Sequence, residues 1–276
     1  MAAPAISTVR RQLTWRIVPP LTFRGKGPLR VYERSTIYYR HRWAIIFSGF
    51  FEPVFYLFSL GIGLNQLVGE VVANGQTVDY TAFVAPALLA SSAMNGAVYE
   101  STMNVFFKLK YGKLYDAMLA TPLQVGDVTL GEIAWCLSRG GLYAIGFLIV
   151  MLAMGLIGSA WAILALPAAV LIGFGFAAVG FAATSFMRSW EDFDLVFLVS
   201  LPLFLFSATF FPLSVYPEAL QWVVRVSPLY HGVELMRSLT IGVVGWDLLG
   251  HVAYFLVMGA IGLAIANRRL HKLLLP

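Results

Sequence analysis

Long apolar stretches separated by short polar segments dominate the chain. Six of them approach or exceed the roughly 20 residues that an α-helix needs to cross the hydrocarbon of a membrane. They run from about Trp43 to Leu64, Tyr80 to Phe106, Val128 to Leu156, Trp161 to Met187, Asp194 to Phe211 and Trp246 to Ala266. The pattern predicts an all-α integral membrane protein with six transmembrane helices in residues 43–266.

A basic segment precedes the first apolar stretch. Residues 1–27 form a basic tail, and Pro28, a favourable first-turn residue, opens a segment in which aromatic and aliphatic residues alternate with arginines. We expect residues 28–42 to form an amphipathic helix on the inner membrane surface. A cytoplasmic extension of the first span is the alternative. A second basic tail, residues 267–276, follows the last span.

The segment after Phe211 stays apolar where a short polar loop is expected, but three prolines interrupt it. Proline breaks a helix, and broken helices at membrane depth are tolerated only where protein or a water-filled cavity covers the freed backbone groups. Residues 212–240 are therefore predicted to form re-entrant outer helices before the last span. A proline-rich external loop on the lipid headgroups is the alternative. Candidates for a substrate path or outer gate are Phe211, Pro212, Tyr216, Trp222 and Tyr230.

Two polar segments lie on the side that we expect to be cytoplasmic. In residues 107–127, Leu114, Met118 and Leu119 can form one face of a short helix that ends before Pro122, since the residue before proline disfavours helix. The second segment, residues 187–194, is short and acidic. Together they offer two contact points to a cytoplasmic partner.

Composition and charge agree with a membrane protein. The chain is 59% hydrophobic and 12% charged, and its mean hydropathy is +0.78. Its length leaves room for one membrane domain and no soluble enzyme domain. The net charge of +5 comes mainly from residues before the first span and after the second, fourth and sixth. This distribution predicts a multi-pass cell-membrane protein with both termini cytoplasmic, attracted to anionic lipid rather than nucleic acid.

The chain lacks the motifs of catalysis and of nucleotide binding. Neither Gly-Lys pair fits GxxxxGK[ST], no HExxH occurs, and Cys136 is the only cysteine. We therefore expect no catalytic residue, no metal site and no cofactor bound by this chain.

Four ionisable residues fall inside the predicted spans: Glu52, Glu100, Glu132 and Arg139. A charge at the centre of a span costs about 2.5 to 3.5 kcal/mol on insertion scales, so each is expected to face protein or water and to have a partner. Glu132 and Arg139 lie two helical turns apart, too far to pair directly but able to share a neighbour such as Glu100. A proton or substrate relay is one interpretation, and polar clamps between helices are the favoured one.

Three segments resemble the membrane (permease) subunit of type-2 ABC exporters, most of all the nodulation-type lipo-oligosaccharide export permeases. They are YYRHRWAIIFSGFFEPVFYLFSLGIGL, KYGKLYDAMLATPLQVGDVTLGE and RSWEDFDLVFLVSLPLFLFSATFFPLSVYPEALQWVVRVSPLYHGVELMR. The resemblance covers roughly residues 30–270. It implies a separate ATP-binding-cassette ATPase that holds ATP and Mg, a second permease copy, and export of a glycolipid, lipo-oligosaccharide or other amphipathic substrate.

The resemblance also implies that the ATPase docks on the surface helix and on the loop from Lys113 to Thr121. The candidate coupling residues are Lys113, Leu114, Tyr115, Asp116 and Met118, with Glu191 and Asp192 as a second contact. Two other classes stay open. One is a proton-coupled secondary transporter that uses the four intramembrane ionisable residues, and the other is a membrane scaffold that transports nothing.

Overall fold

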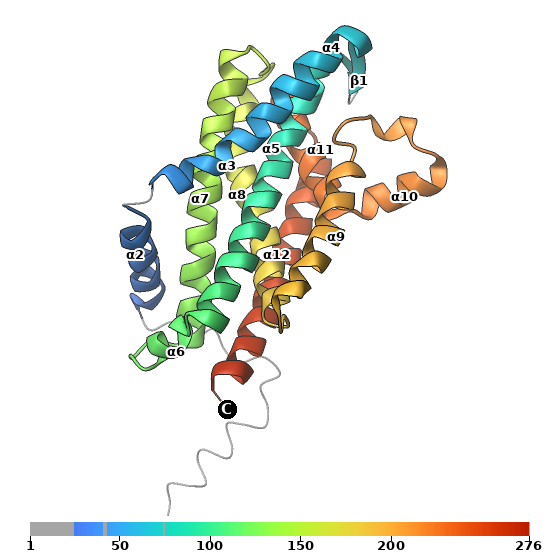
Figure 1. The fold of residues 1–276 in the computed structure, drawn as a ribbon. Coiled ribbons are helices and arrows are strands. Elements are labelled where there is room, and N and C mark those ends of the chain that lie inside the picture. Colours follow the sequence, from blue (N-terminus) through green and yellow to red (C-terminus); the bar gives the residue numbers. More distant parts are fainter. Residues whose placement is uncertain (1–24, 41–42, 74, 276) are drawn as a thin grey trace, which may run out of the picture.

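The structure, a computed structural model, describes residues 25–40, 43–73 and 75–275, without the side chains of residues 43–48 and 50. Most of the predicted basic tail 1–27 and the end of the predicted surface helix, residues 41–42, lie outside the described residues. The described chain is a bundle of helices with one small hairpin (Figure 1).

The elements follow the apolar stretches. The first half contains α2 (Gly27–Arg40), α3 (Trp43–Tyr56), the π-helical η1 (Leu57–Ile62), α4 (Gly63–Val68), β1 (Glu70–Ala73), β2 (Gln76–Asp79), α5 (Tyr80–Tyr99), the π-helical η2 (Glu100–Asn104) and η3 (Phe107–Tyr111), α6 (Leu114–Leu119) and α7 (Val125–Ala153). The second half contains the 3-10 helix η4 (Ala160–Leu164), α8 (Ala165–Thr184), η5 (Trp190–Asp192), α9 (Phe193–Leu205), η6 (Leu213–Val215), α10 (Glu218–Val226), α11 (Pro228–Ile241) and α12 (Asp247–Leu274).

Four helical stretches of the described chain are long and apolar enough to cross a membrane: Tyr80–Tyr111, Val125–Ala153, Ala160–Thr184 and Asp247–Leu274. Helices also occupy the other two predicted spans. However, α9 has 13 residues and ends at Leu205, six residues before the predicted end of the fifth span. At 1.5 Å per residue it is about 20 Å long, short of the roughly 30 Å of hydrocarbon. The protein is membrane-embedded and mostly helical, and the count of six spans stays a prediction.

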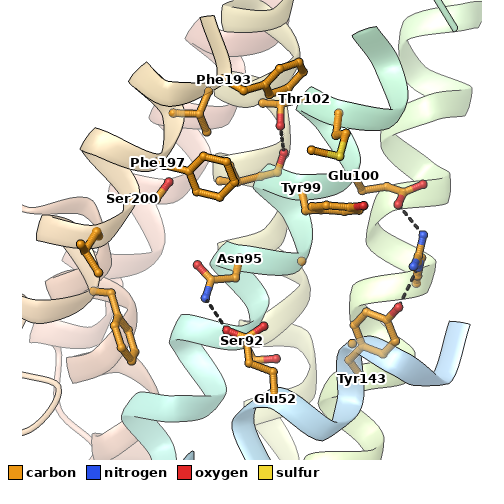
Figure 2. A pocket seen from close by; sticks show the side chains of 18 of the residues that line it. Glu52, Ser92, Asn95, Tyr99, Glu100, Thr102, Tyr143, Phe193, Phe197 and Ser200 are labelled. Atoms are coloured by element: carbon orange, nitrogen blue, oxygen red, sulfur yellow. Dashed lines mark hydrogen bonds and ion pairs between the residues drawn. The ribbon is translucent and has the colours of Figure 1, made fainter. Parts of the chain in front are cut away.

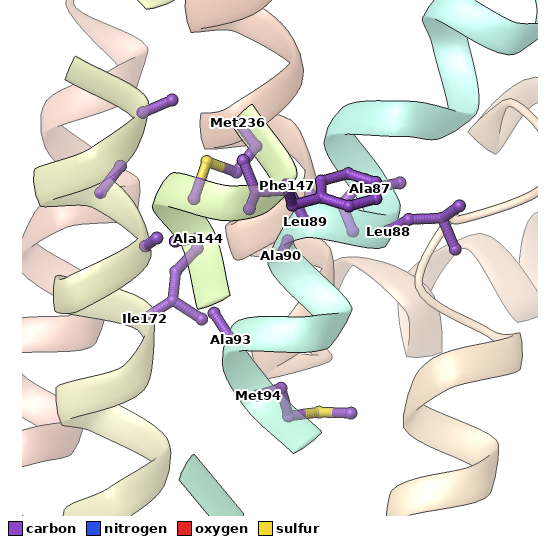
Figure 3. Packing of buried hydrophobic residues seen from close by; sticks show 14 of the residues in the cluster. Ala87, Leu88, Leu89, Ala90, Ala93, Met94, Ala144, Phe147, Ile172 and Met236 are labelled. Atoms are coloured by element: carbon purple, nitrogen blue, oxygen red, sulfur yellow. The ribbon is translucent and has the colours of Figure 1, made fainter. Parts of the chain in front are cut away.

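The core of the bundle forms around α8, which packs against α5, α7 and α12. Buried side chains from these helices and α11 meet there, among them Phe147, Ile172 and Met236 (Figure 3). Small residues bring α8 and α12 together: a Cβ on Gly262 would lie 2.7 Å from the backbone carbon of Ala178. Such close contact is how helices gain packing energy in a membrane, where burial of apolar surface supplies little.

A second, smaller core joins the helices at the end of the bundle that carries α6, which we call the α6 end. It is formed by Val31, Tyr115, Met118, Val128 and Leu270, among others, from α2, α6, α7 and α12. The buried residues of α2 recur every fourth position, Gly27, Val31, Ser35 and Tyr39. They place one face of α2 alongside α7 (Figure 1).

A β-hairpin departs from the all-helical expectation. The antiparallel strands β1 and β2 pair Ala73 with Gln76 across a two-residue loop, and Gly75 in that loop has φ +79°. Asn-Gly in a two-residue loop is a strong hairpin signal, because the turn needs positive φ. The hairpin lies opposite α6, at what we call the hairpin end (Figure 1).

Candidate functional site: a cavity with a polar wall

A cavity of about 580 Å³ opens between α3, α5, α7 and α9. Its apolar lining includes Tyr56, Phe197 and Phe204, and polar side chains from the other helices interrupt that lining. Figure 2 shows Glu52 on α3 and Asn95 on α5 facing across the space toward Ser200 on α9. The cavity thus lies between helices from both halves of the chain.

Glu100 is the centre of the buried part of the wall. Its side chain is 3% exposed and forms an ion pair with Arg139, with Oε2 2.6 Å from Nη1. Asn104 donates to Oε2 at 2.7 Å, and the indole of Trp135 donates to Oε1 at 3.1 Å. Arg139 in turn donates from Nε to the hydroxyl of Tyr143 at 2.7 Å (Figure 2). Three donors, one of which is the counter-charge Arg139, satisfy the carboxylate, as a buried charge requires.

Glu100 begins the π-helical stretch that continues α5. Such local widening of a helix is frequent at functional sites. The π-helical stretch begins at the residue whose carboxylate points toward α7. In the same stretch, the backbone oxygen of Ser101 accepts a hydrogen bond from Thr184 on α8 at 3.0 Å. The stretch is therefore held from two neighbouring helices.

The helix α2 rests on the outer side of this wall. The ring of Tyr39 stacks on Trp135 at 5.1 Å with an interplanar angle of 18°, and Tyr32 meets the same indole edge-on at 5.9 Å. The guanidinium of Arg139 lies 5.6 Å from the centre of the Tyr39 ring. Burial, with the nearby negative charge of Glu100, raises the pKa of Tyr39 to about 12. The tyrosine is therefore neutral at physiological pH.

Glu132 and Arg139 do not share Glu100. Glu132 pairs instead with Lys108 on the η3 stretch, at 2.6 Å between Oε2 and Nζ. The two acidic residues thus clamp α7 to two different levels of the helix that begins at Tyr80. Glu100 has its hydrogen bonds and its counter-charge in place, whereas Glu132 Oε1 is buried with no hydrogen-bond partner among the described residues. The two ion pairs between helices support the interpretation as clamps.

Glu52 differs from the other three ionisable residues. Among the described residues, its carboxylate accepts one hydrogen bond, a long one from Asn95 Nδ2 at 3.4 Å, and the residue is exposed at the cavity. Glu52, Glu100 and Arg139 line the cavity, whereas Glu132 does not.

The predicted helix in residues 107–127 is present as α6, and it turns two of the expected coupling residues inward. Tyr115 is fully buried and Met118 is 7% exposed. Burial raises the pKa of Tyr115 well above its ordinary value. Lys113 and Asp116 are exposed, and Leu114 is half-buried. A partner in solution can touch the exposed residues directly, but it can reach Tyr115 and Met118 only through the backbone they anchor.

The acidic turn before α9 is ordered by its own hydrogen bonds. Asp192 Oδ2 accepts from the backbone N–H groups of Arg188 at 2.6 Å and Ser189 at 3.2 Å, and these bonds hold the pKa of Asp192 below its ordinary value. The hydroxyl of Ser189 donates to Glu191 at 2.7 Å. Asp192 therefore caps the turn, while the exposed Glu191 is the more accessible of the two.

The predicted gate residues do not line the cavity described above. Phe211 and Trp222 are exposed, Pro212 and Tyr230 are half-buried, and the half-buried Tyr216 donates its hydroxyl to the backbone oxygen of Leu205 at 3.4 Å. Their segment contains α10, which extends away from the bundle, and α11, which returns into it after Pro228 (Figure 1).

The sequence interpretation missed Arg237, which is 2% exposed inside the bundle. Its guanidinium donates to Glu234 at 2.8 Å and to the backbone oxygen of Ala208 at 2.8 Å, and it lies 3.9 Å from the centre of the Phe83 ring. Ala208 has φ +55°. Arg237 thus satisfies the freed backbone where the chain bends after α9. The sequence offered one signal for a paired Arg237, because Glu234 lies three residues earlier on the same helix.

Comparison with known proteins identifies relatives along most of the chain. Residues 30–241 match the family described as ABC-2 type transporter. Nodulation protein J from Rhizobium leguminosarum bv. trifolii is 34% identical over 224 residues, covering 79% of this chain and 84% of that protein. Nodulation protein J from Rhizobium meliloti (strain 1021) is 30% identical over 263 residues, covering 93% and 99%.

Proposed function

Because the chain belongs to the ABC-2 type transporter family, we propose that it is the permease of an ATP-driven exporter of an amphipathic substrate. A glycolipid or lipo-oligosaccharide is the preferred cargo, moved out of the cytoplasm or the inner leaflet. The similarity to Nodulation protein J over almost the whole chain supports this choice. So does a cavity with aromatic and hydrogen-bonding walls, which suits a molecule with an apolar tail and a polar head.

The ATPase is a separate subunit that docks at the α6 end. The exposed side of α6, with Lys113, Asp116 and Ala117, is free to contact it, and the turn at Glu191 is the second contact. Tyr115 and Met118 anchor α6 in the smaller core. A push on α6 therefore moves α7, which forms one wall of the cavity, and α2, which packs against α7.

The α6 end faces the cytoplasm in this proposal, and both termini lie there. Lys108, Lys110, Lys113, Arg188 and Lys272 lie near the ends of helices on that side. At the hairpin end, Arg225 is the exposed basic residue among those that the structure describes. Positive charge accumulates on the cytoplasmic side of membrane proteins, which supports the orientation.

A second copy of the chain completes the path. The helix α9 exposes a run of large apolar side chains: Leu195, Phe197, Leu198, Val199 and Leu201 are each 59 to 68% exposed, and Phe197 and Leu201 also line the cavity. On α3, at the other side of the cavity mouth, Phe55 is 65% exposed. Pairing two permeases through these faces would close the cavity from the side and leave it open along the membrane normal.

The exposed face of α6 over buried anchors is the observation that carries this proposal, and cysteine cross-linking tests it. The only native cysteine, Cys136, is 3% exposed, so thiol background is low. In membranes that also contain the partner ATPase, the Ala117→Cys variant is expected to cross-link to the ATPase. The control Ser214→Cys lies in the exposed part of the segment between α9 and α10 and is expected not to.

Transport itself distinguishes the exporter from the other classes. In inverted vesicles that contain both subunits, uptake of labelled lipo-oligosaccharide should require ATP and hydrolysis by the ATPase. Uptake driven by a pH gradient in vesicles without the ATPase would refute the proposal and favour a secondary transporter. No uptake of any amphiphile, with Ala117→Cys unreactive toward the ATPase, would favour a scaffold.

A further inference from the structure

The cavity holds one carboxylate whose charge is not balanced. Three residues with charged side chains line it, and one of them, Arg139, is committed to Glu100 by a 2.6 Å ion pair. Glu52 has no basic partner among the described residues, and its one hydrogen bond is the long contact with Asn95. The described lining therefore carries a net charge of −1.

The groups around Glu52 divide by chemistry. Asn95 and Ser92 lie beside it on α5, and Ser200 faces them from α9 (Figure 2). Tyr56 and Phe204 continue the lining with aromatic surface, and the two rings lie 5.6 Å apart. The cavity thus combines one polar region centred on a carboxylate with an adjoining apolar wall.

A carboxylate accepts hydrogen bonds and has none to donate. At membrane depth, where the dielectric is low, it attracts hydroxyl, amide and ammonium groups and repels an anion strongly. A bound head that donates to Glu52 also replaces the hydrogen bonds with water that this exposed carboxylate would lose when the cavity is filled.

We propose that Glu52 selects the polar head of the cargo: the cavity accepts an amphiphile whose head presents hydrogen-bond donors and carries no negative charge. The aromatic wall takes the apolar tail, and Asn95 holds the carboxylate toward the cavity. That the bound amphiphile is a transported cargo rests on the proposed export function. The selection of its head by Glu52 is a property of binding alone.

Equilibrium binding to the complex of permease and ATPase in lipid nanodiscs tests this. Three probes share a pyrene-labelled dodecyl chain and end in a glucosyl, an ammonium or a sulfate group. The wild type is expected to bind the glucosyl and ammonium probes at least about tenfold more tightly than the sulfate probe. Glu52→Gln should erase most of the difference between ammonium and sulfate, whereas Glu52→Asp should keep the order of the three probes.

Two further variants serve as controls for the role of Glu52. Glu218→Gln removes an exposed carboxylate of α10 outside the cavity and should change none of the affinities. Ser200→Lys adds a cation on the opposite wall and should raise affinity for the sulfate probe, so it tests the idea even if Glu52→Gln does not fold.

An unchanged order of probes in Glu52→Gln, or weak binding of all three probes by the wild type, overturns the inference. A further overturning result is an equal response in Glu218→Gln. If Glu52→Gln changes the order while vesicles show no ATP-driven uptake, the selection by Glu52 holds and the export function fails. If ATP-driven uptake is indifferent to Glu52 and to the charge of the head, the export function holds and the selection by Glu52 fails.

Discussion

Replacing Arg139 by Met removes one half of the buried ion pair in the cavity wall. Glu100 would then keep its hydrogen bonds from Asn104 and Trp135 but lose its counter-charge while 3% exposed. The methionine fills much of the volume of the arginine stem, so the change tests charge rather than packing. We expect the free energy of unfolding to fall, because the unpaired carboxylate stays buried.

The structure sets the size of this effect. At 2.6 Å and an effective dielectric of about 20, the attraction of the pair is about 6 kcal/mol before desolvation is subtracted. Removing one partner of a buried pair typically costs about 3 to 5 kcal/mol. Because two neutral donors remain on Glu100, we expect a loss near the lower limit, about 3 kcal/mol.

Chemical unfolding in mixed micelles measures this loss. A second variant, Glu100→Gln combined with Arg139→Met, removes both charges and should recover part of it, with a coupling of about 2 kcal/mol. The matched control is Arg30→Met, which breaks the exposed pair of Arg30 and Glu33 and should cost below about 1 kcal/mol. A loss in Arg139→Met no larger than in Arg30→Met would refute the reasoning. Survival of transport in the double variant would exclude an essential proton relay through Glu100.

Two further predictions concern packing and the bend after α9. Gly262→Ala should lower the free energy of unfolding by about 1 to 3 kcal/mol, because its Cβ would meet the backbone of α8, whereas Gly250→Ala on the same helix has open space and should be neutral or stabilising. Arg237→Met should lower the midpoint of thermal unfolding by several degrees, since it leaves a carbonyl and Glu234 without their partner. The exposed Arg225→Met is its control and should leave the midpoint nearly unchanged; equal midpoints for the two variants would contradict the assigned role of Arg237.

Much of the candidate site is visible in the sequence because it depends on local properties. The apolar stretches predict the helices, and the position of Pro122 predicts where α6 ends. Glu52, Glu100 and Arg139 stand out because charges are rare in such stretches, and all three line the cavity. The Asn-Gly pair at residues 74–75 is also a hairpin signal. The hairpin was not predicted, because the apolar stretches on both sides indicate helices.

Only the fold decided which acidic side chain pairs with which basic one. Glu100 and Arg139 are 39 residues apart, and their contact requires a particular rotation of α5 against α7. The same packing of these helices pairs Glu132 with Lys108. The packing of α3 leaves Glu52 at the cavity without a basic partner of its own among the residues described. Periodicity along one helix does not specify its rotation against another when nearly every face is apolar.

The sequence by itself thus determined the membrane character, the family resemblance and the places where helices break, because hydrophobic length and proline act locally. The tertiary structure alone decided that Tyr115 and Met118 point inward and that Arg237 is buried. It also placed the cavity between α3 and α9, because long-range packing, which no local pattern encodes, sets the direction in which each side chain points.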